Sequence, residues 1–235
     1  MRKILSYLMY LTCVVIISCS DEEVTPDTRL PDDNLNRYLA LGDSYTIGES
    51  VPATGRFPIQ LTDSLRERGF EIATPRVIAT TGWTTGNLLT ALGQEQPNGN
   101  YDLVTLLIGV NNQFQGRSLE EYEREFRELL DMAIGYAMGN KDRVIVVSIP
   151  DYGYTPFGAG RQEQISRGVD QFNEANRRIT DSMNVAYVNI TPISRNGLDR
   201  PELVANDGLH PSAIQYSEWV ELLIPEAQRI LEAGN

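Results

Sequence analysis

The feature that most constrains how this chain can fold is a regular alternation of short apolar runs with longer stretches of helical period. Five runs have the length of strands, and the third and fourth are nearly continuous Leu, Ile and Val, as strands buried on both faces of a sheet require. These runs are Arg37–Leu41, Pro75–Ala79, Leu103–Ile108, Val144–Ile149 and Val185–Ile190. Strand and helix alternating five times predict an open α/β sheet of parallel strands with helices on both faces.

The stretches between these runs are expected to form the crossover helices. The clearest is Leu119–Met138, where one apolar stripe opposes a face of Glu and Arg. Ser118 with Glu121 predicts a capping box at its start, and Gly139 predicts a stop at its end. Pro225 is expected to kink or break the last helix. The other helices are expected at Phe57–Arg68, Thr84–Leu92, Gln162–Met183 and Ser212–Ala233.

The first part of the chain differs in composition from the rest. Two basic residues precede an apolar stretch that stops at Cys19, so residues 1–18 are expected to be a secretory signal. Aliphatic residues and a serine directly before Cys19 resemble the lipobox of bacterial lipoproteins. This implies lipid on the cysteine and anchorage to the cell envelope, on the periplasmic or surface face of the outer membrane; an ordinary signal peptide is the alternative. Residues 19–35 are acidic with two prolines, which predicts a flexible tether, and 36–235 are expected to form one domain.

Charge and composition narrow the functions that this domain can have. Removal of residues 1–18 takes the formal charge from −12 to −14, which argues against nucleic acid as a partner. One of the two cysteines lies in the leader and the other is Cys19, so the domain has no thiol for a disulfide, a nucleophile or a metal site. With a single histidine, no cofactor or transition metal is expected, and only a carboxylate calcium site stays open.

Polar residues with catalytic chemistry follow the predicted strands, at the end where ligands bind in parallel sheets. Ser44 follows the first strand, and the only histidine, His210, lies in a loop after the fifth. Asp207 stands three residues before His210, where it can accept the Nδ1 proton and leave Nε2 as a base. A serine hydroxyl needs such a base to become a nucleophile. Taken singly, the serine also fits a turn, and the histidine also fits a surface loop.

Hydrolysis through a serine also needs donors for the negative oxygen of a tetrahedral intermediate. Gly82 follows the second strand, and Asn111 follows the third with a side-chain amide that can donate. A plain turn is the alternative at each. Four such segments in this order resemble the SGNH, or GDSL, hydrolase family, whose sequence blocks carry a serine, a glycine, an asparagine and a histidine. The matching residues are Gly42-Asp43-Ser44, Gly82, Gly109-Val110-Asn111, Asp207 and His210.

This resemblance covers residues 37–231 and implies a serine esterase on a flavodoxin-like, three-layer α/β/α sandwich with strand order 2-1-3-4-5. The catalytic triad that it implies is Ser44, Asp207 and His210. The oxyanion hole that it implies is formed by Ser44, Gly82 and Asn111. Two departures from the family matter. Tyr45 stands where the family has leucine, and Asn112 replaces an aspartate, which leaves the support of the oxyanion asparagine open.

Aromatic residues near the expected site bear on the substrate. They would form either a sugar-stacking rim or an acyl wall, and simple packing of a long loop is the alternative. The candidates for substrate binding are Trp83, Tyr152 and Tyr154. Short acyl esters are the expected substrates, acetyl groups on a carbohydrate among them. The alternatives are longer acyl chains, as in lysophospholipids or thioesters, and a tethered glycan-binding protein without turnover.

Overall fold

The computed structural model describes residues 35–234, and the expected leader, Cys19 and nearly all of the expected tether lie outside them. Five parallel strands form one sheet in the order β2-β1-β3-β4-β5. The strands are β1 (Tyr38–Gly42), β2 (Arg76–Ala79), β3 (Leu103–Leu107), β4 (Val144–Val147) and β5 (Ala186–Val188). Strand order and direction confirm the fold class expected from the sequence.

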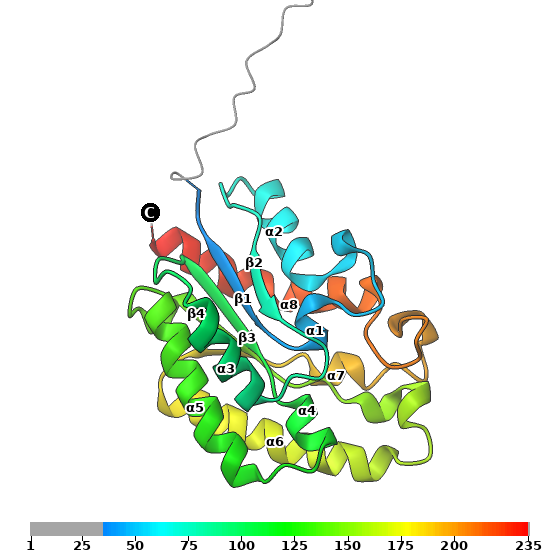
Figure 1. Cartoon of the computed structure of the whole chain (residues 1–235). Coiled ribbons are helices and arrows are strands. Elements are labelled where there is room, and N and C mark those ends of the chain that lie inside the picture. The colour runs from blue at the N-terminus through cyan, green and yellow to red at the C-terminus, as the bar shows by residue number, and fades with distance from the viewer. Residues whose placement is uncertain (1–34, 235) are drawn as a thin grey trace, which may run out of the picture. The chain divides into compact units, whose positions relative to one another are not determined.

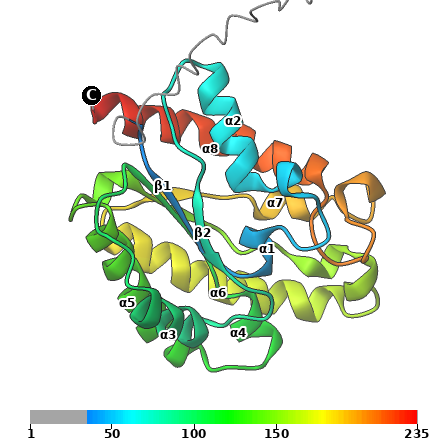
Figure 2. The ribbon, with the colours of Figure 1, turned by 45° about the horizontal axis from the view of Figure 1, so that its top comes forward.

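Helices cover both faces of this sheet. The long helices are α2 (Phe57–Glu67), α3 (Thr85–Glu95), α5 (Leu119–Tyr136), α6 (Gln162–Ser182) and α8 (Ala213–Ala233). Helices α2 and α8 pack together on one face, and α3, α5 and α6 lie on the other, which makes three layers (Figure 1, Figure 2). Among the helices within residues 35–234, none is long and apolar enough to cross a membrane.

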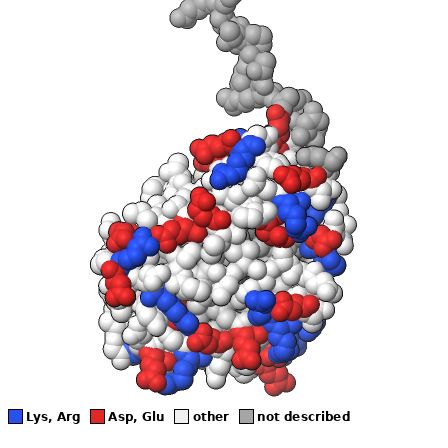
Figure 3. Space-filling model, turned by 180° about the vertical axis from the view of Figure 1, so that it is seen from behind, with Lys and Arg blue, Asp and Glu red and all other residues white. Residues whose placement is uncertain are grey.

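Short helical turns lie in the connections. Three short α-helices follow β1, β3 and β5 at the carboxyl edge of the sheet, and these are α1 (Ser44–Ile47), α4 (Val110–Phe114) and α7 (Thr191–Ser194). Single 3₁₀ turns occupy Ala53–Gly55, Lys141–Arg143, Tyr152–Tyr154, Pro156–Gly158 and Pro201–Leu203. Acidic and basic side chains are interspersed on the face shown in Figure 3, with no single basic region there.

Two details of the helices differ from the expectation. The expected break at Pro225 is wrong, because α8 runs on through this residue. The proline is exposed, so water can bond to the carbonyl that loses its N–H partner, while buried Leu223 and Ala227 hold both halves of the helix against the core. Only the serine half of the expected capping box forms. Ser118 accepts the N–H of Glu121, whose carboxylate faces a neighbouring arginine.

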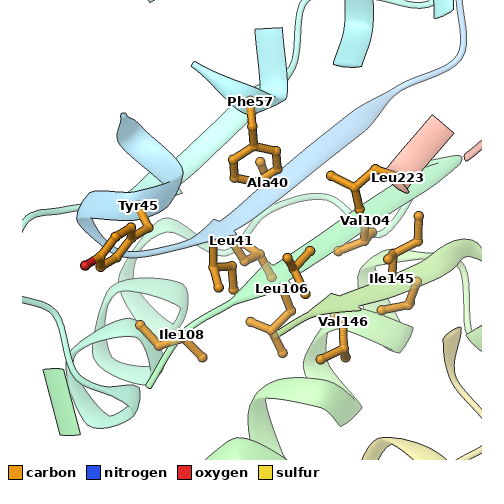
Figure 4. Packing of buried hydrophobic residues seen from close by; sticks show 14 of the residues in the cluster. Ala40, Leu41, Tyr45, Phe57, Val104, Leu106, Ile108, Ile145, Val146 and Leu223 are labelled. Carbon is orange, nitrogen blue, oxygen red and sulfur yellow. The ribbon is translucent and has the colours of Figure 1, made fainter. Parts of the chain in front are cut away.

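The core lies on both faces of the sheet, which explains the unbroken apolar runs. Leu41, Leu106 and Val146 are register partners across β1, β3 and β4, and all three are fully buried. Figure 4 shows these side chains together, with the ring of Phe57 from α2 over Ala40 of β1. Each large aliphatic side chain that is fully buried in this way stabilises the fold by about 1.5–3 kcal/mol.

Candidate active site

Ser44 opens α1 directly beyond the carboxyl end of β1. The strand ends at Gly42, where a Cβ atom would overlap the carbonyl oxygen of Leu107 and the hydroxyl of Thr46. Glycine is therefore required for so close an approach of β1 to β3. This tight turn brings the serine to the edge of the sheet, where it is only 3% exposed.

His210 lies in the loop before α8 with its ring next to Ser44. The distance from His210 Nε2 to Ser44 Oγ is 3.0 Å, and the distance from His210 Nδ1 to Asp207 Oδ2 is 2.7 Å. The other oxygen of Asp207 accepts the backbone N–H groups of Leu209 and His210, at 2.9 and 3.0 Å. The carbonyl of His210 accepts the N–H of Ala205 at 2.8 Å. Hydrogen bonds within the loop therefore hold the imidazole in place, and each of its two nitrogens has a hydrogen-bond partner.

The charge state of Asp207 fits this arrangement. Burial raises the pKa of the Asp207 carboxyl, but hydrogen bonds from Ser50 and His210 and from two backbone N–H groups outweigh it and hold the pKa well below its usual range. The carboxylate is thus ionised at any ordinary pH. It accepts the Nδ1 proton of His210, which leaves the Nε2 lone pair directed at the hydroxyl of Ser44.

Three residues that can donate hydrogen bonds line the space beside Ser44. Its own N–H is the first of α1 and so has no partner within that helix. Gly82 has a φ of +82°, the left-handed region that favours glycine, and lines the same space. Asn111 donates one amide proton to the carbonyl of Trp83 at 3.0 Å, and its second amide proton is left for a ligand. The structure thus brings the expected oxyanion residues to one cavity.

Asn112 joins the segments that carry these donors. Its Oδ1 accepts the N–H of Thr85 at 3.0 Å, and its Nδ2 donates to the Thr85 hydroxyl at 2.7 Å. That hydroxyl in turn donates to Glu125 at 2.5 Å. An aspartate at position 112 could not donate to Thr85 and would add a charge near Glu125. The amide of Asn112 can therefore make both hydrogen bonds to Thr85, and these bonds hold α4 to the start of α3.

The cavity beside Ser44 has a volume of about 130 Å³ and a lining that is mainly apolar. Its apolar lining comes from Tyr45, Val110, Phe114, Tyr152, Phe157 and Leu209. Within residues 35–234, no group of three or more His, Cys, Asp or Glu side chains lies in position to hold a metal ion. The reactive groups thus open into a small, largely apolar space.

Three rings form one side of this cavity, and we call Phe114, Tyr152 and Phe157 the aromatic wall. Their centroids lie 6.0 to 6.3 Å apart, within the range of favourable aromatic pairs. The hydroxyl of Tyr152 donates to Gln113 at 2.9 Å, which fixes its ring. Phe114 and Phe157 are 52% and 43% exposed, so two apolar rings keep open faces at the site.

The aromatic residues expected at the site separate into two groups. Tyr152 lines the cavity, whereas Trp83 and Tyr154 are not among its lining residues. Trp83 is partly buried and packs against the core, because the turn at Gly82 directs only its carbonyl towards Asn111. Sequence reasoning missed Phe114. Its position three residues after Asn111, on the same face of a helical turn, is the signal that could have found it.

Asp43, beside the serine, is a buried acid whose pKa is strongly raised. It is 1% exposed, and its side chain accepts the N–H of Tyr45 at 3.0 Å. Burial raises the pKa of Asp43 to about 7, although hydrogen bonds from the backbone of Tyr45 and of Asp43 itself lower it. The folded protein therefore keeps this proton up to about pH 7, whereas an unfolded chain releases it near 3.8.

The variant Asp43→Asn is expected to gain stability over the wild type as pH rises. The folded wild type binds one more proton than the unfolded chain between pH 3.8 and about 7, so its stability falls across this window. Asparagine does not titrate. The difference in free energy of unfolding between the two proteins should be small at pH 4 and on the order of 4 kcal/mol at pH 8. Urea unfolding at both pH values measures it, and an equal difference at both would contradict the raised pKa of Asp43 in the folded protein.

A serine, a histidine and an aspartate joined in this order at the carboxyl edge of a parallel sheet, with donors facing the same cavity, define the class of serine hydrolases. Residues 40–217 match the GDSL-like lipase/acylhydrolase family, and the chain belongs to this family. It is accordingly an ester-hydrolysing enzyme, and the resemblance found in the sequence is confirmed.

Individual relatives share this architecture. An arylesterase of Vibrio mimicus is 25% identical over 187 residues, which span 78% of this chain and 84% of that protein. The lipase/acylhydrolase of Enterococcus faecalis superposes with a TM-score of 0.63 at 20% identity, covering 83% of this chain and 96% of that one. The acetylxylan esterase Axe2 of Geobacillus stearothermophilus has a TM-score of 0.58 at 20% identity, covering 83% and 94%. At 20% identity, the two solved structures show that the fold is shared.

Proposed function

We propose that this protein hydrolyses short acyl esters through an acyl-enzyme on Ser44. The observation that carries the proposal is the continuous chain of hydrogen bonds from Asp207 through His210 to Ser44, at the wall of a small apolar cavity. Each link has the length of a good hydrogen bond, and the carboxylate at its end is ionised.

The reaction follows from these positions. His210 Nε2 takes the proton of the Ser44 hydroxyl while Oγ forms a bond to the ester carbonyl carbon. The carbonyl oxygen becomes an oxyanion and accepts hydrogen bonds from the N–H groups of Ser44 and Gly82 and from the amide of Asn111. The carbon–alkoxy bond then breaks, and His210 returns the proton to the leaving alcohol. Water repeats the two steps on the acyl-enzyme and releases the acid.

The size of the cavity favours a short acyl group. Pockets that hold drug-sized ligands have volumes of about 300–1,000 Å³, and this cavity has about 130 Å³. That volume suits an acetyl or similarly short group and leaves little room for the chain of a lysophospholipid or a fatty thioester. Similarity to an acetylxylan esterase agrees with an acetyl ester, and a carbohydrate carrier is our proposal for the alcohol part.

The same observations give less support to the two main alternative functions, a lipid hydrolase and a glycan-binding protein. A lipid hydrolase would need a long apolar groove. A glycan-binding protein without turnover would have no use for an ionised Asp207 behind a histidine that contacts a serine. The aromatic wall offers apolar faces inside the cavity, so it fits the acyl part of the substrate better than it fits a sugar ring.

Hydrolysis of p-nitrophenyl acetate, butyrate and octanoate tests the proposal, because the leaving group is the same in all three and only acyl length varies. We expect kcat/KM to be highest for acetate, to fall for octanoate, and to vanish in Ser44→Ala. A preference for octanoate would favour the lipid hydrolase. Activity on no ester above that of the variant would favour the binding protein.

We also propose that Cys19 carries lipid and anchors the enzyme to the bacterial cell envelope. Support comes from the sequence, in which an apolar run with two basic residues before it stops at this cysteine. Fractionation of cells should find the protein with the membranes and its Cys19→Ala variant outside them. Equal distribution of the two proteins would contradict the anchor.

A further inference from the structure

The carboxylate of Asp207 accepts a side-chain hydrogen bond that the triad itself does not include. The hydroxyl of Ser50 donates to Asp207 Oδ2 at 2.6 Å, across 157 residues of sequence. The same oxygen accepts the Nδ1 proton of His210 at 2.7 Å. Two backbone N–H groups occupy the other oxygen. Four donors therefore hold this one carboxylate, and Ser50 and His210 share an acceptor atom.

The backbone at Ser50 has a conformation that is uncommon for serine. Its φ is +65°, a region that residues other than glycine rarely adopt. Within residues 35–234, three more residues of this kind occur, and each follows a helix end where such a turn is common: Gln96, Met138 and Asn184. Ser50 is the third residue of a turn in which the N–H of Val51 donates to the carbonyl of Gly48 at 3.4 Å, a position where a positive φ is common. This turn presents the hydroxyl of Ser50 to Asp207.

The loop that carries Ser50 is also hydrogen-bonded to a second segment of the site. Its neighbour Glu49 accepts the hydroxyl proton of Thr81, which lines the cavity beside Gly82. One short loop thus connects the acid of the triad with the segment that carries an oxyanion donor. Two segments of the site therefore hold this loop in position.

We infer that Ser50 is a positioning residue that holds the carboxylate of Asp207 and sets how strongly it accepts the proton of His210. Ser50 acts through Asp207 and touches no reacting atom. Its hydroxyl draws negative charge from Oδ2, so its removal makes this oxygen a stronger acceptor for Nδ1–H. Removal also leaves the carboxylate with one restraint fewer. The effect on turnover rests on the proposed function, whereas the effect on the Nδ1 proton does not.

Two matched variants separate the hydroxyl from the backbone. Ser50→Gly removes the hydroxyl and adopts the left-handed φ without strain, and Ser50→Ala removes the hydroxyl and keeps the strain. Both variants leave the carboxylate of Asp207 with one restraint fewer, so both should lower kcat for p-nitrophenyl acetate about threefold to tenfold with KM unchanged. Ser182→Ala, which loses an exposed hydroxyl bonded only to a backbone carbonyl, serves as the control and should leave kcat unaltered.

Proton NMR gives a readout that does not depend on turnover. The chain has a single histidine, so the downfield resonance of an Nδ1 proton bonded to a carboxylate belongs to His210 without further assignment. It should move further downfield in both Ser50 variants and stay in place in the control. A resonance that stays in place in both variants would overturn the inference, because the hydroxyl of Ser50 would then have no effect on the Nδ1 proton. A change in only one of them would overturn it too, because the backbone at residue 50 would then be the cause. If the resonance moves while no variant or wild type hydrolyses esters, the proposed function fails and this inference stands.

Discussion

Replacing His210 with alanine is expected to lower kcat for p-nitrophenyl acetate by roughly 10⁴-fold to 10⁶-fold, while KM changes little. The reason lies in the composition as much as in the geometry. This is the only histidine of the chain, so no other imidazole can take the proton of Ser44. Without a base 3.0 Å from its oxygen, the serine hydroxyl is a weak nucleophile at neutral pH.

Initial rates over a range of substrate concentrations measure this effect, and circular dichroism of the variant shows whether the fold is kept. Within residues 35–234, His210 makes hydrogen bonds to Ala205 and Asp207 in its own loop and to Ser44 in α1, and none to a strand, so loss of its ring should leave the sheet intact. A folded variant with kcat within tenfold of the wild type would show that another group acts as the base, and the mechanism above would be wrong.

Replacing Asn111 with alanine is expected to lower kcat about 100-fold to 1,000-fold, which corresponds to about 2.7–4 kcal/mol of transition-state stabilisation. The amide of Asn111 faces a cavity in which the carbonyl oxygen of the ester gains a full negative charge only in the transition state. KM should therefore change far less than kcat. The variant also loses a hydrogen bond to Trp83, so its stability has to be measured beside its rates.

Asn98→Ala is the matched control for this experiment. Asn98 is an exposed amide before the amino end of β3, at the opposite end of the strand from Asn111. Its loss should leave kcat within twofold. If Asn111→Ala keeps full turnover on a folded protein, the asparagine is no part of the oxyanion hole.

The fold was predictable because its pattern is local. Strands buried on both faces need continuous apolar runs, and the runs of β3 and β4 stand out from the charged faces of α5 and α6 in the sequence alone. The carboxyl ends of parallel strands lie at one edge of the sheet, so the sequence alone predicts that residues directly after different strands lie close together. The break expected at Pro225 does not occur, because packing on both sides of this residue holds α8 together, and the sequence alone does not show that packing.

The parts of the site that escaped prediction depend on the direction of side chains. Trp83 is adjacent in sequence to Gly82, yet its ring turns towards the core, because neighbours in a tight turn point different ways. Ser50 is an exposed serine with no motif around it, and only the fold places its hydroxyl on a carboxylate 157 residues away. The pairing of Asn112 with Thr85 likewise forms between two segments that share no pattern.

The central claim is that Ser44 attacks the substrate, and covalent labelling with an activated organophosphonate ester tests it most directly. Such a reagent imitates the tetrahedral intermediate and reacts with an activated serine. We predict one phosphonyl group per chain, found by mass spectrometry on the peptide that contains Ser44, with turnover lost in proportion to labelling and no labelling in His210→Ala. Labelling on another residue, or full turnover by protein that is completely labelled at Ser44, would contradict the account.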